Sequence, residues 1–249
     1  AITNTGDADT DALTIAGAVT AGGSGSVTLT QMSSGNVVVN SGQTVTATGD
    51  TLTISAANAA TVNGTLSATD GVVSVSAGSG GIDLADGAVS ASGGTVTLTA
   101  TGGGTIDGDA TSTAAEVTAA DLTLSASAGA IGGETPLDTG VTHQLTASAF
   151  DGIDLNNSSS SATRLEAEVF GTGAITFDQS GGGTLTVGKA ETNDGAVTLT
   201  AEGGNLAAES VSAGGGEDTD DVTLTTTTSG DIVLGAVTVA GSGDGWVTS

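Results

Sequence analysis

Val27-Thr28-Leu29-Thr30 is a short stretch in which apolar residues alternate with threonine, and the chain returns to this phrase repeatedly. Such alternation predicts a half-buried β-strand, because successive side chains of a strand point to opposite sides. Close variants of the phrase begin at Leu52, Val73, Val96, Leu122, Val197 and Val222. The gaps between their first residues are 25, 21, 23, 26, 75 and 25, and the gap of 75 fits three units of 25. A period of about two dozen residues predicts a solenoid.

Two weaker apolar runs lie between successive phrases, separated by Gly, Ser, Asp or Asn residues that favour turns. After the phrase at Val73, for example, these runs occupy 82–84 and 88–91. Each unit therefore predicts three short strands, and stacking the units gives an all-β, parallel β-helix of about ten coils. We expect a right-handed coil, as is usual for parallel crossover connections. The whole chain, 1–249, is expected to form one such domain.

Two regions depart from the alternating pattern and predict loops that leave the coil. Residues 132–144 contain Pro136 and His143 and few periodic apolar residues. Residues 156–162 are polar and rich in serine. Because the coil pattern resumes after each region, neither is expected to divide the chain into domains.

The composition suits thin aliphatic layers better than an ordinary globular core. Aromatic residues make up 2% of the 249 residues, glycine accounts for 42 of them, and cysteine is absent. The core must therefore come from Val, Leu, Ile and Ala repeated along an axis. The absence of cysteine excludes disulfide bonds.

The net charge of −26 limits the partners of the chain. There are 28 acidic residues, and the only basic ones are Arg164 and Lys189. Nucleic acids and anionic membrane surfaces are bound by clustered Lys and Arg, so neither is expected as a partner. No apolar run reaches the length of a transmembrane helix, and we expect no membrane insertion.

The stretches Gly-Ala-Val-Thr-Leu-Thr-Ala at 195–201 and Gly-Ala-Ile-Thr-Phe at 173–177, with Gly-x-Ile turns between strands, resemble the filamentous haemagglutinin class of secreted bacterial exoproteins, and more broadly autotransporter passengers. The resemblance implies a stretch of right-handed β-helical shaft at the bacterial cell surface, used in adhesion, aggregation or biofilm formation. It also implies an extracellular location. The partners would be neighbouring repeats or further copies stacked end to end, with contacts to cell surfaces or glycans. No functional residue of the family can be matched in this chain.

Two acidic clusters predict calcium sites, because Ca²⁺ prefers carboxylate oxygens. The residues are Asp7, Asp9 and Asp11 in the first cluster, and Glu217, Asp218, Asp220 and Asp221 in the second. The first begins like an EF-hand loop but lacks Gly at its sixth position and Glu at its twelfth. The alternative is that both clusters are solvated turns before a strand. No other cofactor is predicted.

Catalysis is not expected, although enzymes that act on carbohydrates occur on β-helices. Acidic residues are spread along every turn, so a pair such as Asp83 and Asp86 is expected without catalysis. The chain has one Trp and no Tyr to stack on sugar rings. A carbohydrate-binding or carbohydrate-cleaving β-helix remains an alternative to the structural role.

Ice binding is the other alternative. If Val and Leu point inward, the threonines of the phrases should stack into two parallel ladders on one flat face, as in β-solenoid ice-binding proteins. The residues are Thr28, Thr30, Thr97, Thr99, Thr198, Thr200, Thr223 and Thr225. The simpler explanation is that threonine is a favourable exposed strand residue.

Overall fold

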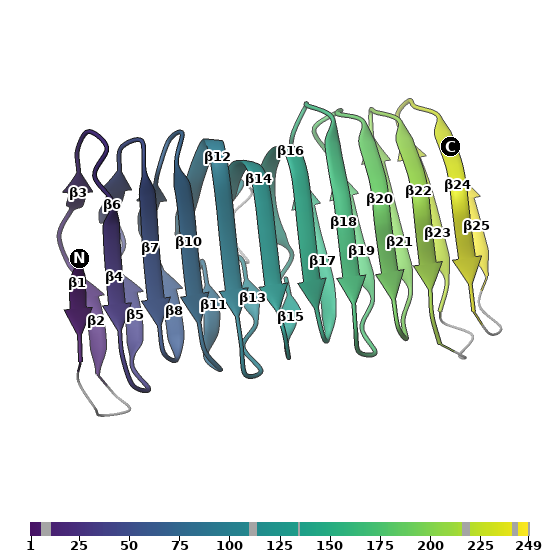
Figure 1. The fold of residues 1–249 in the computed structure, drawn as a ribbon. Helices are drawn as coiled ribbons and strands as arrows, with labels where there is room; N and C mark the ends of the chain where they lie inside the picture. The colour runs from purple at the N-terminus through teal and green to yellow at the C-terminus, as the bar shows by residue number, and fades with distance from the viewer. Residues whose placement is uncertain (6–10, 110–113, 134, 216–219, 241–243, 249) are drawn as a thin grey trace.

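The computed structural model describes residues 1–5, 11–109, 114–133, 135–215, 220–240 and 244–248, and in them the chain winds into a parallel β-solenoid (Figure 1). All its strand pairings are parallel, each joining a strand to its counterpart in the next coil. The predicted β-helix of about ten coils is therefore confirmed. Among the described residues there is no helix long and apolar enough to cross a membrane.

The coil has a front face, a back face and, in its first half, a third side. The front face holds β1 (Ile2–Asn4), β4 (Val27–Gln31), β7 (Thr51–Ala56), β10 (Val72–Ala77), the second halves of β12 (Ala88–Ala100), β14 (Val117–Ala126) and β16 (Leu137–Ala149), and then β18 (Thr163–Val169), β20 (Leu185–Thr192), β22 (Leu206–Ala213) and β24 (Ile232–Val239). The back face holds β2 (Ala12–Ile15), β5 (Asn36–Val39), β8 (Ala59–Val62), β11 (Gly81–Asp83), β13 (Ile106–Asp107), β15 (Ala130–Ile131), β17 (Gly152–Asn157), β19 (Ile175–Gln179), β21 (Val197–Glu202), β23 (Val222–Thr227) and β25 (Gly245–Thr248). The third side holds β3 (Val19–Ala21), β6 (Thr44–Ala47), β9 (Thr65–Ser67) and the first halves of β12, β14 and β16.

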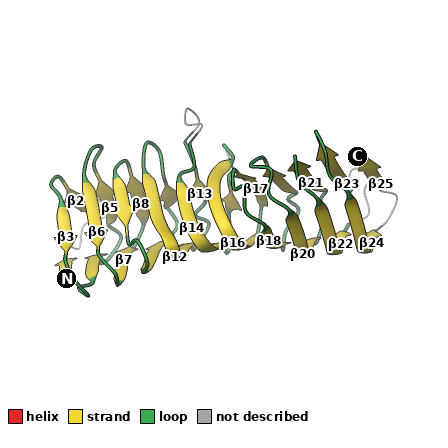
Figure 2. Ribbon diagram, turned by 90° about the horizontal axis from the view of Figure 1, so that it is seen from above, coloured by secondary structure: helices red, strands yellow, loops and turns green. Residues whose placement is uncertain are grey.

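The winding is right-handed. In Figure 1 the front strands run downward and the fainter, more distant back strands run upward while the chain advances from left to right. Figure 2, which looks down on the coil, shows β3, β6, β12, β14 and β16 lying across the upper, third side of its first half.

Alternation along each strand sorts apolar side chains to the inside and hydroxyls to the outside, as the sequence predicts. Leu29 and Leu98 are completely buried, whereas Thr28 and Thr97 on the same strands are half-buried at the surface. Because like residues stack from coil to coil, the interior is a column of thin aliphatic layers. Along most of the coil, parallel pairing then gives an inward aliphatic residue aliphatic neighbours in the coils before and after it.

The third side ends at β16, and this changes the coil. Leu137–Thr139, at the start of β16, pair with Leu155–Asn157 at the end of β17, which belongs to the back face. From there on each coil consists of two strands, such as β19 with β20 and β21 with β22. The prediction of three short strands in every coil holds only through β9, because β12, β14 and β16 each join the third side to the front face as one strand. A strand long enough to cross two sides removes the need for a corner.

The recurring phrase also moves from one face to another. Successive counterparts of Leu122 on the front face are Leu145, Leu165 and Val187, so three coils end ten residues before Val197. Val197 lies in β21 on the back face. Reading the gap of 75 residues as three whole coils was therefore wrong. Both faces require the same apolar–polar alternation, and the phrase does not distinguish them.

The two predicted loops are shorter than expected. Within 132–144, residues from Leu137 onward belong to β16, and His143 lies on this strand with its Nδ1 2.6 Å from the Asp121 carboxylate. The strand was missed because Thr139 occupies an inward position and interrupts the apolar alternation. Within 156–162, β17 continues to Asn157 and β18 begins at Thr163, so the connection is limited to 158–162.

The inner layers predict the cost of core truncation. Leu98→Ala and Leu199→Ala each remove a completely buried side chain and should lower the free energy of unfolding by about 2–5 kcal/mol. Thr97→Ala, an outward change beside Leu98, is the control and should cost far less. Urea denaturation measures all three. Equal stability of the Leu98 and Thr97 variants would contradict the assigned inner face.

Candidate functional site

Polar side chains gather inside the coil where the third side ends. The described part of the chain has ten buried polar or charged residues, and six of them surround this junction: Glu116, Thr139, Asn157, Ser159, Thr163 and Gln179. Elsewhere the interior is almost entirely aliphatic. Buried polar groups are costly unless they are hydrogen-bonded, so a cluster of them marks a place with a particular task.

Asn157 replaces a missing strand at this junction. Its side-chain Oδ1 accepts a hydrogen bond from the Val141 amide at 2.7 Å, and its Nδ2 donates to the Val141 carbonyl at 3.2 Å. The same Nδ2 donates to Gln179 Oε1 at 2.9 Å, while Gln179 Nε2 donates to the Ser159 carbonyl at 2.7 Å. The side chain thus satisfies a peptide group that the next coil would otherwise pair, and it connects two coils rigidly.

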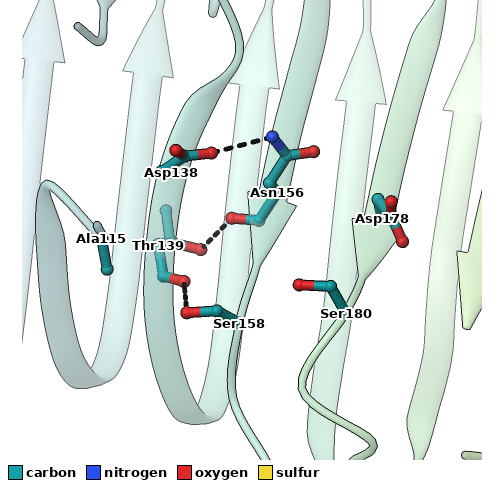
Figure 3. Close-up of a pocket in the computed structure, with 7 residues that line it drawn as sticks. All are labelled: Ala115, Asp138, Thr139, Asn156, Ser158, Asp178 and Ser180. Atoms are coloured by element: carbon teal, nitrogen blue, oxygen red, sulfur yellow. Dashed lines mark hydrogen bonds between the residues drawn. The ribbon is translucent and has the colours of Figure 1, made fainter. Parts of the chain in front are cut away.

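The same junction leaves a groove on the outer surface (Figure 3). The groove encloses about 420 Å³ and is lined by Ala115, Asp138, Thr139, Asn156, Ser158, Asp178 and Ser180. Its floor comes from the beginning of β16 and the ends of β17 and β19, whose outward residues Asp138, Asn156 and Asp178 are register neighbours. A volume of this size is typical of small-ligand sites.

Part of the lining is held by hydrogen bonds and part of it is free. Asn156 Nδ2 donates to Asp138 Oδ1 at 2.8 Å, and Ser158 Oγ donates to the Thr139 carbonyl at 3.2 Å. Asp178 lies to one side of these pairs in Figure 3. Its Oδ1 is buried and has no hydrogen-bond partner among the described residues. Because its Oδ1 is covered by protein, Asp178 can present only its other carboxylate oxygen to the groove.

A second, shallower hollow extends the groove along the same two strands. It encloses about 190 Å³ and is lined by residues that include Gly132, Asp151, Asp154 and Thr176. Asp154 and Asn156 are successive outward residues of β17, and Thr176 and Asp178 are successive outward residues of β19. The two hollows therefore follow one another along the strand direction.

Burial disfavours the ionised form of two carboxyl groups in these hollows. Desolvation raises the pKa of Asp154, and desolvation together with the nearby Glu202 carboxylate raises the pKa of Asp178. The basic side chains are engaged on the front face instead. Arg164 donates to Glu166 and to both carboxylate oxygens of Glu209.

Lys189 is held in the same way as Arg164, between Glu168 and Glu191 at 2.8 and 2.9 Å. These contacts raise the pKa of both basic groups, and the Arg164 guanidinium lowers the pKa of Glu209. No basic side chain therefore lines either hollow to offset the negative charge of its carboxylates.

A buried carboxyl group anchors one wall of the groove. Glu116 is 2% exposed, and its side chain accepts hydrogen bonds from the amides of Asp109 at 3.2 Å and Asp138 at 2.8 Å. Burial is the main cause that raises the pKa of Glu116, and the two amide bonds oppose it. Glu116, directly before β14, thus connects the backbone at Asp109 to the first residues of β16.

The calcium prediction finds no support in the part of the chain that the structure describes. Asp7, Asp9, Glu217 and Asp218 lie outside the described residues. Asp11 precedes β2 in the first coil, whereas Asp220 and Asp221 precede β23 near the other end. No group of three or more Asp, Glu, His or Cys within the described ranges is arranged to hold a metal ion.

The predicted threonines do point outward, but they do not all lie on one face. Thr28, Thr30, Thr97 and Thr99 point outward from the front face, whereas Thr198, Thr200, Thr223 and Thr225 lie on the back face. Two unbroken columns of hydroxyls cross six coils of the front face. They consist of Thr28, Thr53, Ser74, Thr97, Thr123 and Thr146, and of Thr30, Ser55, Ser76, Thr99, Ser125 and Ser148. Glu166 and Glu168 end the columns in the next coil.

Comparison with protein-family models, curated proteins and solved structures gives no match for this chain. The architecture is therefore established by the coil itself. The groove was not predicted from the sequence, because its residues come from three strands that the periodic pattern does not relate to one another. Thr139, a hydroxyl at an inward position, was the one available signal.

The shifted carboxyl groups predict an unusual pH dependence of stability. A carboxyl group whose pKa is raised on folding gives its full stability below the unfolded pKa and loses it as the pH rises through the folded pKa. Asp178→Asn should therefore raise the melting temperature at pH 7, and the gain should disappear near pH 4. Glu209→Gln has the opposite sign: its pKa is lowered, so the variant should melt below the parent at pH 7. Calorimetry from pH 4 to 7 tests both, and a lower melting temperature of Asp178→Asn at pH 7 would refute the desolvation argument.

Proposed function

We propose that this chain is a structural shaft segment of an extracellular bacterial filament or adhesin, without catalytic activity. The observation that carries the proposal is the continuous parallel register from β1 to β25, in which every described coil stacks on the one before it. A molecule built this way is long and stiff. The resemblance to filamentous haemagglutinins in the strand phrases agrees with that role.

The charge distribution supports a role as a rod that stays separate from its neighbours along its sides. The net charge is −26, so parallel rods repel one another in water and attract cations. At an ionic strength of about 0.1 M, exposed charges more than about 10 Å apart are largely screened from one another. Divalent and monovalent cations should therefore both allow rods to come closer together. An acidic exterior also keeps a chain of high β-content soluble.

The last coil supports continuation of the stack. Leu234 pairs with the buried Ala208 and Val247 with the buried Leu224, so both occupy inward positions, yet they are 44% and 53% exposed. Ile2, the register partner of the buried Leu29, is 43% exposed in the first coil. Unpaired strands with exposed inward side chains are suited to pairing with a further coil, in a longer chain or in another copy.

End-to-end association is therefore expected for the 249-residue chain. Negative-stain electron microscopy should show rods longer than the roughly 48 Å of ten stacked coils. Leu234→Lys places a charge on the open end and should reduce the long rods at least tenfold in number. Val233→Lys, the neighbouring outward position, is the matched control and should leave them. Monomeric particles from the unmodified chain at all concentrations and salt conditions would contradict stacking.

Ice binding is a second candidate, favoured by the twelve uncharged hydroxyl residues in register on the front face of a strongly acidic protein. Thr97→Tyr would interrupt this array at its centre and should abolish thermal hysteresis. Thr198→Tyr makes the same change on the back face and should have no effect. No hysteresis in the unmodified chain, or equal loss in both variants, would remove this candidate.

A further inference from the structure

We infer that the groove at the end of the third side binds a neutral carbohydrate chain. The groove is formed by outward residues of β16, β17 and β19 and continues into the hollow beside Asp154 and Thr176. This inference concerns the side of the rod and does not depend on whether rods stack end to end.

The shape of the site favours an extended ligand. The two hollows enclose about 420 and 190 Å³ and follow one another along β17 and β19. Neighbouring strands of the floor are about 4.8 Å apart, and successive outward residues of one strand are about 6.6 Å apart. The floor therefore presents polar groups in a regular two-dimensional array, which suits a linear polymer of repeating units better than one small molecule.

The chemistry of the lining favours hydroxyl donors. Asp178 lines the groove and can present to it only the carboxylate oxygen other than the covered Oδ1, and the Asp138 carboxylate is already bonded to the Asn156 amide on one side. Ser180 adds a hydroxyl that both donates and accepts. A sugar ring carries adjacent hydroxyls, so it can donate hydrogen bonds to a carboxylate and accept one from a serine hydroxyl at the same time. Hydrogen bonds from hydroxyls to a carboxylate are among the strong ones.

The same groups oppose the other ligand classes. Asp138, Asp154 and Asp178 repel anions, including acidic polysaccharides. Of the seven residues lining the larger hollow, only Ala115 is apolar, so polar contacts must supply the specificity of the site. A metal ion at Asp138 would face the Asn156 amide hydrogens, which point at that carboxylate. A lysine ammonium would have to lose part of its hydration to enter the groove, which costs more than the transfer of a hydroxyl.

The floor is held rigid, as a binding site requires. Thr139 Oγ1 donates to the Asn156 carbonyl at 2.9 Å and Asn157 fixes the coils beneath, while Glu116 holds the wall that carries Ala115. Little conformational entropy is lost when a ligand meets groups that are already fixed.

Titration of the full 249-residue chain with five-unit xylan, mannan and cellulose oligosaccharides tests the inference, and NMR or calorimetry gives the affinity. At least one of these probes should bind, and Asp178→Asn should weaken that binding at least tenfold. The same variant should melt higher than the parent at pH 7, so loss of folding cannot explain the loss of affinity. Asp231→Asn removes the same charge at an exposed position near the other end of the coil and should change neither property.

Three outcomes would overturn the inference. The first is failure of all three oligosaccharides to bind at millimolar concentrations. The second is binding of polygalacturonate, pentalysine or CaCl₂ in place of them, with the same dependence on Asp178. The third is an equal loss of affinity in Asp178→Asn and Asp231→Asn. Electron microscopy of the Asp178→Asn variant separates this inference from the shaft proposal, because the variant should still form rods.

Discussion

The structure depends on one constraint: each strand must find its backbone hydrogen-bond partners in the coils before and after it. Unpaired peptide groups are costly away from water, so the register established at β1 and β4 is carried through to β25. The register shifts at three strand pairs, yet inward residues stay above inward residues on both sides of each shift. The core then needs only small and medium aliphatic side chains, and Phe177 is the one aromatic residue buried in it among those the structure describes.

The groove lies at the place where no neighbouring strand can satisfy this constraint. When the third side ends, the Val141 peptide loses the strand that would have paired with it, and the Asn157 amide supplies both missing hydrogen bonds. That solution brings polar groups inside and leaves a step outside, where the half-buried Asp138, Asn156 and Asp178 lie side by side. A change in the cross-section of the coil thus produces a hollow of about 420 Å³ on its outer surface.

Much of the fold was readable from the sequence because one pattern serves every strand. Alternation at Val27–Thr30 and Val96–Thr99 identified the inward leucines and the parallel stacking correctly. The same generality hid the change of face at Val197, since front and back strands read alike. The calcium clusters and the threonine ladders were inferred from neighbours in sequence, whereas the groove joins residues such as Asp138 and Asp178 that only the register brings together.

Asp178 shows why the groove is more than a by-product of the junction. An aspartate whose ionisation is disfavoured by burial makes the folded chain less stable at neutral pH, and an asparagine or threonine would fit the same outward column, as Asn156 and Thr200 do in the coils on either side. Groups that reduce stability are expected where they serve a function. The neighbouring coils show that the fold itself does not require a carboxylate in this column, which agrees with the binding role proposed for the groove.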